Sequence, residues 1–224
     1  MKPTARSGGP SPSVRLFLIR HGITAANREM RFVGARDDPL TAEGHRQAEG
    51  IARMLSSVRL AALLSSPAAR TRETAEPLRR AGDLPLGIDH RLREMSFGDW
   101  EGRRQDEITA AKGGLEALRR WQAKPESAPP GGGESFASVQ RRLVELADEL
   151  AQRHDGERIA LITHVGPIKA LLYAALGLPL TESGRLFLDP ATVHVIDWSR
   201  RPTVRLINAT PSLEDARWFT PDRG

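Results

Sequence analysis

The stretch Leu16-Phe17-Leu18-Ile19-Arg20-His21-Gly22-Ile23-Thr24 decides the fold. It begins within a short apolar run, from Val14 to Ile19, that only Arg15 interrupts. A run of this length, rich in branched residues, is typical of a strand buried on both faces of a sheet. The run ends at Arg20-His21-Gly22, so a cation, an imidazole and a glycine follow the strand directly. In open α/β sheets, ligands bind at this carboxyl edge.

Three later segments place polar side chains just after a predicted strand. These strands cover residues 60–64, 84–88 and 158–163, and they lead into Ser65-Ser66-Pro67 with Arg70, into Glu94, and into His164. Carboxyl ends of parallel strands meet at one edge, so we expect these side chains to converge with Arg20 and His21. Ser66 is expected to cap the helix that follows the second strand, with Pro67 in its first turn.

Helical periodicity fills the segments between these strands and predicts an α/β fold. Apolar stripes indicate helices that begin near residues 41, 67, 135 and 167. In the last third, residues 186–188, 193–198 and 204–207 resemble strands joined by short turns, which fits antiparallel edge strands. We therefore expect three layers, with helices on both faces of a mixed, mostly parallel sheet. Residues 14–210 are predicted to form one domain between a disordered tail (1–13) and a C-terminal tail (211–224).

Composition narrows the classes of function. The chain has 224 residues and no cysteine, which excludes disulfides, thiolate zinc sites and a cysteine nucleophile. No apolar run is long enough to span a membrane, and the N-terminus lacks the apolar core of a signal peptide. We therefore expect a cytoplasmic protein without a membrane partner. The net charge is +5, but the arginines are scattered and aromatic residues are few, which disfavours nucleic acid. A homodimer is left open.

Two histidines, two arginines and one carboxyl group at one sheet edge suit phosphoryl transfer. Arginine clamps stabilise negative charge on a phosphoryl group where no metal ion does so. The sequence has neither a Walker loop nor an acidic cluster with magnesium spacing. We therefore expect no metal and no cofactor. Zinc bound by His21, His164 and Glu94 is the alternative, and the flanking arginines would repel that cation. The other histidines are expected to be structural or solvated: His45, His90, His154 and His194.

The sequence resembles the histidine phosphatase superfamily, whose fold is that of phosphoglycerate mutase, from about Val14 to Ile207. The resemblance rests on five motifs in the family's order. These are Arg20-His21-Gly22-Ile23-Thr24 with Asn27, the segment Gly34 to Thr41, Ser65-Ser66-Pro67-Ala68-Ala69-Arg70, Glu94 with Phe97-Gly98, and Thr163-His164.

The resemblance implies a role for each matched residue. His21 is expected to be the phosphorylated nucleophile, and Glu94 the proton donor. Arg20, Arg70 and His164 would line the phosphate pocket. Further contacts with the small phosphorylated substrate are expected from Asn27, Gly34, Phe97 and Val165.

Residues 97–102 and 129–135 resemble the α-ribazole phosphatase and broad-specificity acid phosphatase branch of that superfamily. This resemblance implies hydrolysis of small phosphate monoesters through a phosphohistidine, without a metal. A cofactor-dependent phosphoglycerate mutase is the first alternative, although Arg103-Arg104 followed by Asp106-Glu107 is not a clean match to the mutases' second anion site. A catalytically silent phosphate-binding module is the second alternative.

Overall fold

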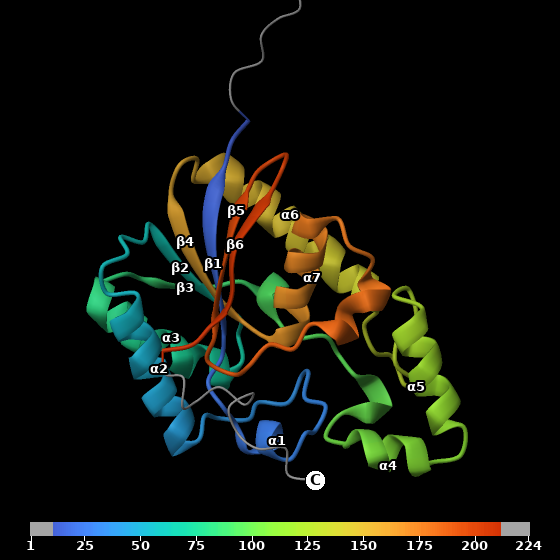
Figure 1. The fold of residues 1–224 in the computed structure, drawn as a ribbon. Coiled ribbons are helices and arrows are strands. Elements are labelled where there is room, and N and C mark those ends of the chain that lie inside the picture. Colours follow the sequence, from blue (N-terminus) through green and yellow to red (C-terminus); the bar gives the residue numbers. More distant parts are fainter. Residues whose placement is uncertain (1–10, 212–224) are drawn as a thin grey trace, which may run out of the picture.

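The strand predicted from Val14 lies in the middle of the sheet. The structure, a computed structural model, describes residues 11–211, so the predicted tails lie outside it except for residues 11–13 and 211. β1 (Val14–Arg20) pairs in parallel with β4 (Arg158–Thr163) and antiparallel with β5 (Val193–Trp198). The sheet has the order β3-β2-β4-β1-β5-β6 (Figure 1). The other strands are β2 (Ala62–Ser65), β3 (Leu86–Ile88) and β6 (Thr203–Ala209), and β3 and β6 form the two edges.

Side chains that alternate along β1 reach two separate cores, one on each face of the sheet. Leu16 and Leu18 pack with α6 (Phe136–Arg153) and α7 (Val165–Leu176). Phe17 and Ile19 pack with α2 (Ala42–Met54) and α3 (Ala69–Gly82). Burial on both faces explains why this strand is a continuous apolar run. The predicted fold class, three layers around a mixed and mostly parallel sheet, is confirmed.

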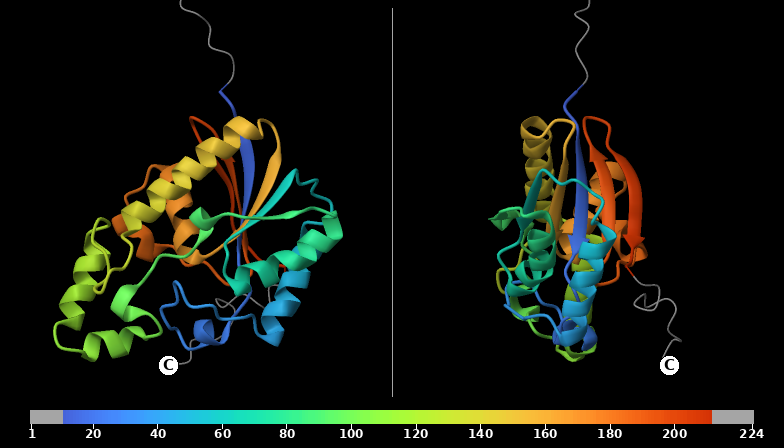
Figure 2. Two further views of the ribbon diagram at one scale, coloured as in Figure 1. Left: turned by 180° about the vertical axis from the view of Figure 1, so that it is seen from behind. Right: turned by 90° about the vertical axis from the view of Figure 1, so that its left-hand side faces the viewer.

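Smaller elements gather at the end of the sheet where β1 ends. Figures 1 and 2 show α1 (Ala25–Arg28), α4 (Gln105–Ala110) and α5 (Gly114–Ala123) beyond that edge. Three 3-10 helices complete the described elements, at His90–Leu92, Gly98–Trp100 and Leu180–Arg185 (η1 to η3). Within residues 11–211, no helix is both long and apolar enough to cross a membrane.

Three local predictions were wrong. Residues 186–188 form no strand, because Leu188 is buried and its carbonyl accepts a hydrogen bond from the Arg20 side chain. Ser66 does not cap α3, whose N-cap is Ala68 without a side-chain hydrogen bond. β5, which carries His194, is not an edge strand, since β6 pairs along its outer side.

Candidate active site

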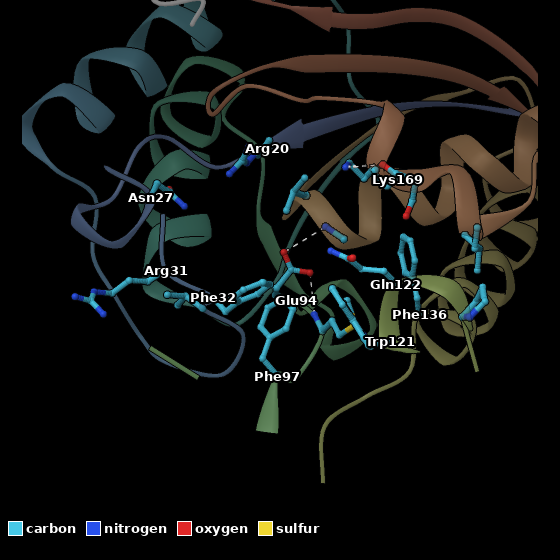
Figure 3. Close-up of a pocket in the computed structure, with 18 of the residues that line it drawn as sticks. Arg20, Asn27, Arg31, Phe32, Glu94, Phe97, Trp121, Gln122, Phe136 and Lys169 are labelled. Carbon is cyan, nitrogen blue, oxygen red and sulfur yellow. Dashed lines mark hydrogen bonds between the residues drawn. The ribbon is translucent and has the colours of Figure 1, made fainter. Parts of the chain in front are cut away.

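A cavity of about 560 Å³ opens at the carboxyl edge of the parallel strands (Figure 3). Seven of the residues predicted for the site line it: Arg20, His21, Asn27, Arg70, Glu94, Phe97 and Val165. His164 lies behind His21, with 5.2 Å between the ring centroids, and it is not among the lining residues. Gly34 does not line the cavity either, and its carbonyl accepts a hydrogen bond from Arg70 at 3.1 Å. The structure thus brings together side chains that lie far apart in the sequence.

His21 is held as a neutral imidazole with one nitrogen available. Its Nδ1 lies 2.8 Å from the carbonyl oxygen of Gly22, so Nδ1 carries the proton and donates it to this bond. Nε2 therefore keeps its lone pair. Burial, together with the positive charges of Arg70 and Arg20, lowers the pKa of His21 well below its ordinary value. The loop requires glycine after His21, because a Cβ on Gly22 would lie 2.6 Å from the carbonyl oxygen of Gly44.

Arg70 joins the second histidine to the loop after α1. Its Nε donates to Nδ1 of His164 at 3.2 Å, and its Nη1 donates to the Arg36 carbonyl at 2.7 Å. Because Nδ1 of His164 accepts a hydrogen bond, the proton of the neutral ring lies on Nε2, which is 2.8 Å from Ser66 Oγ. Burial and the charge of Arg70 lower the pKa of His164 well below its ordinary value. His164 is thus a neutral ring fixed between Ser66 and Arg70.

Arg20 and Asn27 lie on one side of the cavity in Figure 3. The Arg20 guanidinium donates a hydrogen bond to the carbonyl of Leu188. Asn27 belongs to a capping box at the start of α1: its Oδ1 accepts from the Thr24 N–H at 3.1 Å, and its own N–H donates to Thr24 Oγ1 at 3.2 Å. The Thr24-x-x-Asn27 spacing therefore orients the Asn27 side chain, a local reason for the motif's form.

Glu94 is a buried carboxyl group, 6% exposed, in the wall of the cavity. Its oxygens accept from the N–H groups of Met95 at 2.9 Å and Gly166 at 3.3 Å. Burial raises the pKa of Glu94 above its ordinary value despite these bonds. The nearest arginines in sequence pair with other carboxylates: Arg91 with Asp89 and Glu149, and Arg93 with Glu134. Glu94 can therefore hold a proton and release it into the cavity.

Glu101, which sequence analysis did not single out, joins the two loops beside Glu94. Its carboxylate accepts from three backbone N–H groups: Gly34 at 3.0 Å, Ala35 at 3.2 Å and Phe97 at 2.9 Å. Because Gly34 also holds Arg70 through its carbonyl, Glu101 supports the arginine and the Phe97 wall together. A carboxylate that binds backbone groups leaves no spacing pattern, so the sequence could not reveal this contact.

Aromatic rings form one part of the cavity wall. Trp121 packs edge-on against Phe32 and Phe97, with centroid separations of 6.1 and 6.3 Å, and against Trp100 at 5.6 Å. These residues come from separate loops and from α5, so no single sequence window contains the cluster. Lys169 of α7 also lines the cavity and was missed, because its place depends on how η3 folds across the end of α7.

The described part of the chain contains no group of three or more histidine, aspartate or glutamate side chains arranged to hold a metal ion. His21, His164 and Glu94 all lie at the site, but apart from Nε2 of His21 their polar side-chain atoms have other partners. Nε2 of His164 contacts Ser66 and its Nδ1 contacts Arg70, and the Glu94 oxygens accept hydrogen bonds from backbone N–H groups. The site thus holds two buried imidazole rings and a buried carboxyl group next to a cavity that Arg20 and Arg70 line.

Comparison with known proteins identifies a family that matches most of the chain. Residues 16–210 match the model of the histidine phosphatase superfamily, branch 1. The bifunctional protein Rv2228c of Mycobacterium tuberculosis is 35% identical over 210 residues, covering 92% of this chain and 57% of that protein. The chain thus spans little more than half of that relative. Phosphoserine phosphatase 1 of Hydrogenobacter thermophilus is 32% identical, over 89% of this chain and 94% of the relative.

A solved structure agrees in fold. The mycobacterial glucosyl-3-phosphoglycerate phosphatase Rv2419c, solved in complex with VO3, superposes with a TM-score of 0.79 at 32% identity. That match covers 88% of this chain and 99% of the solved one. The family match, the order of the motifs and the fold agree over nearly the whole described chain. The chain belongs to branch 1 of the histidine phosphatase superfamily.

Proposed function

We propose that this protein hydrolyses small phosphate monoesters through a phosphohistidine on His21, without a metal ion. The observation that carries the proposal is the state of His21. It is a neutral imidazole whose proton is fixed on Nδ1 by the Gly22 carbonyl, so Nε2 is left as a nucleophile in a cavity lined by Arg20 and Arg70. A neutral nitrogen beside two cations suits attack on an anionic phosphoryl group.

The first step transfers the phosphoryl group to His21. The Nε2 lone pair forms the bond to phosphorus, and the bond between phosphorus and the ester oxygen breaks. Glu94 gives its proton to the departing oxygen, so the alcohol leaves neutral and Glu94 becomes a carboxylate. Nδ1 keeps its proton, and its bond to Gly22 stabilises the positive charge that the ring gains.

The second step returns the protein to its starting state. A water molecule attacks phosphorus, and the Glu94 carboxylate takes the proton that water loses. The bond between phosphorus and Nε2 breaks, and its electron pair returns to the ring. Inorganic phosphate leaves, and Glu94 is again protonated. The raised pKa of Glu94 suits both halves of this cycle, because an acid must also be able to act as a base.

A trapping experiment tests the intermediate. Brief mixing with a radiolabelled phosphate ester, followed by an alkaline quench, should leave label on the peptide that contains His21. A phosphoramidate survives base and is lost in acid, whereas a serine ester survives acid. His21→Ala should lose the label and nearly all turnover. Label on Ser65 or Ser66 would contradict the proposal.

Metal independence has its own test. Turnover of p-nitrophenyl phosphate should be unchanged by EDTA, because Arg20 and Arg70 supply the positive charge at the phosphate. Activity that disappears with the chelator and returns with a divalent ion would overturn this part.

Two other activities remain as outcomes of one assay. Given 3-phosphoglycerate with 2,3-bisphosphoglycerate, the protein should release phosphate and form little 2-phosphoglycerate. Fast isomerisation with slow hydrolysis would indicate a cofactor-dependent mutase. Tight binding of phosphate esters without turnover would indicate a silent binding module. A panel of phosphomonoesters, including phosphoserine and an α-ribazole phosphate, would then identify the preferred leaving group.

A further inference from the structure

Lys169 is a cation inside the cavity that the proposed mechanism does not use. It lies on α7, five residues after His164, and its side chain is half-buried. Its Nζ donates one hydrogen bond, to the Ser183 carbonyl in η3 at 2.8 Å. An ammonium group has three donors, so this bond leaves two of them for another acceptor. Figure 3 shows Lys169 and Gln122 on the side of the cavity away from Asn27.

Lys169 forms no ion pair within the described part of the chain. Arginines around the cavity mouth are paired with carboxylates: Arg31 with Glu29, and Arg104 with Asp106. Within residues 11–211, no carboxylate lies within ion-pair distance of Lys169, and its one hydrogen-bond partner is a neutral carbonyl. Burial and the charge of Arg20 lower its pKa to about 8, although Glu94 acts in the opposite direction, so it is still mostly protonated at neutral pH. A half-buried ammonium that has no ion pair attracts an anion.

Two adjoining hollows show where Lys169 lies relative to the catalytic cavity. A second hollow adjoins the first, and Lys169, Arg20 and Asn27 line both. His21 and Glu94 line only the first. Lys169 therefore lies where the catalytic cavity meets the second hollow, within the cavity that His21 and Glu94 also line.

We propose that Lys169 selects phosphate monoesters whose leaving alcohol carries a second anionic group, a carboxylate or a second phosphate. The inference rests on the proposed phosphatase function and names its substrate class. The ammonium binds the second anion while Arg20 and Arg70 hold the phosphate that is transferred. The aromatic side chains of Phe97 and Trp121 line the same cavity.

A purely structural role for Lys169 predicts a different result. Tyr173 lies one turn further along α7, and its hydroxyl donates to the Glu182 carbonyl, also in η3, at 2.6 Å. Lys169 and Tyr173 therefore both tie η3 to α7. If Lys169 only anchors η3, then Tyr173→Phe should reproduce the effect of Lys169→Met. Tyr173→Phe is thus a matched control that removes an η3 bond and keeps the cation.

The kinetic test compares two esters of equal size. 3-Phosphoglycerate carries a carboxylate where glycerol 3-phosphate carries a neutral hydroxymethyl group. The wild type should prefer 3-phosphoglycerate in kcat/KM, and Lys169→Met should reduce that preference roughly ten- to a hundredfold, as expected for a hydrogen bond between charged groups. Lys169→Arg should keep most of the preference, and Tyr173→Phe all of it. Propane-1,3-diol bisphosphate against its monophosphate distinguishes a second phosphate from a carboxylate.

A binding measurement separates this inference from the proposed function. In a His21→Ala background, calorimetry with 3-phosphoglycerate and glycerol 3-phosphate needs no turnover. Adding Lys169→Met should weaken binding of the first ligand by the same roughly ten- to hundredfold factor relative to the second. If the trapping experiment finds no phosphohistidine but calorimetry shows this ligand preference, only the proposed phosphatase function is overturned. Two results would overturn the role of Lys169. One is equal affinity of the His21→Ala protein for both ligands. The other is an equal loss of the preference for 3-phosphoglycerate in Lys169→Met and in Tyr173→Phe.

Discussion

The hydroxyl oxygen of Ser66 lies 2.8 Å from Nε2 of His164, at the point where β2 passes into α3. On the other side of the ring, Arg70 donates to Nδ1 at 3.2 Å. The two bonds fix the tautomer and the plane of a ring that lies 5.2 Å from that of His21. The Ser66 hydroxyl therefore positions a histidine, and it also accepts a hydrogen bond from the Ala68 N–H at 3.3 Å, next to the start of α3.

Removing this hydroxyl should reduce catalysis without unfolding the protein. Ser66→Ala should lower kcat/KM on every phosphate ester roughly fivefold, because one net hydrogen bond is worth about 1 kcal/mol. Ser66→Thr, which keeps the hydroxyl, should recover part of the loss. The measurement is steady-state turnover, with a thermal melt to check folding.

Ser65→Ala is the matched control for this prediction. The Ser65 hydroxyl is equally buried, but it donates to the Ser66 carbonyl and does not contact His164. Its loss should affect melting more than turnover. Equal catalytic losses in both alanine variants would show that Ser66 acts only through local packing.

The loss of activity on removing the Glu94 proton is expected to depend on the basicity of the leaving group. Glu94→Gln should lower kcat/KM on alkyl phosphates by roughly 10²- to 10⁴-fold, the usual worth of proton transfer. p-Nitrophenolate leaves without a proton, so the same variant should lose much less on p-nitrophenyl phosphate. Equal losses on both esters would remove the acid role from Glu94.

Glu101→Ala should lower stability and weaken substrate binding, although Glu101 is not one of the residues assigned to the reaction. It leaves the N–H groups of Gly34, Ala35 and Phe97 without their acceptor, and it frees the loop whose carbonyl holds Arg70. We expect a lower melting temperature and a higher KM for all phosphate esters. Glu101→Gln, which keeps one side-chain oxygen, should lie between the variant and the wild type.

Glu116→Ala is the comparison for Glu101, because Glu116 is an exposed carboxylate on α5 that pairs with Arg120 at 2.9 Å. Surface pairs of this kind contribute little. If Glu101→Ala melts and turns over like Glu116→Ala, the two loops are held by other contacts.

The two histidines and Arg70 share one property: each comes soon after a strand of the parallel part of the sheet. His21 and His164 come after β1 and β4, whose apolar runs predict the strands and hence the edge where both histidines meet. Arg70 follows β2 in the same way. The topology of a parallel sheet converts these sequence positions into spatial neighbours, so much of the site is predictable.

The residues that sequence analysis missed depend on tertiary contacts. Lys169 needs η3, and the segment after η3 was wrongly predicted to be a strand. Trp121 reaches the cavity only because α5 lies beyond the sheet edge, next to the loop that carries Phe32. Apolar periodicity predicts which face of a helix is buried, but not which loop will lie over its end.

His194 provides a test of stability against pH. It is fully buried in β5, and its Nδ1 accepts from the Asn208 N–H at 3.0 Å. Burial and the charge of Arg20 lower its pKa from 6.5 to about 3. Below pH 6.5 the unfolded chain therefore binds a proton that the folded chain does not. The stabilisation is complete above 6.5 and is lost as the pH falls toward 3.

The expected size of this loss follows from the pKa difference. Between pH 6.5 and about pH 5, His194 lowers the free energy of unfolding by about 2 kcal/mol, since each pH unit below 6.5 lowers it by about 1.4 kcal/mol. Urea unfolding at neutral pH and at about pH 5 should show that His194→Gln loses about 2 kcal/mol less than the wild type. His21 and His164 act in the same direction in both proteins, so they cancel in this difference. An equal loss in the two proteins would show that His194 is protonated in the folded state, and the bond from Asn208 would then need a different partner.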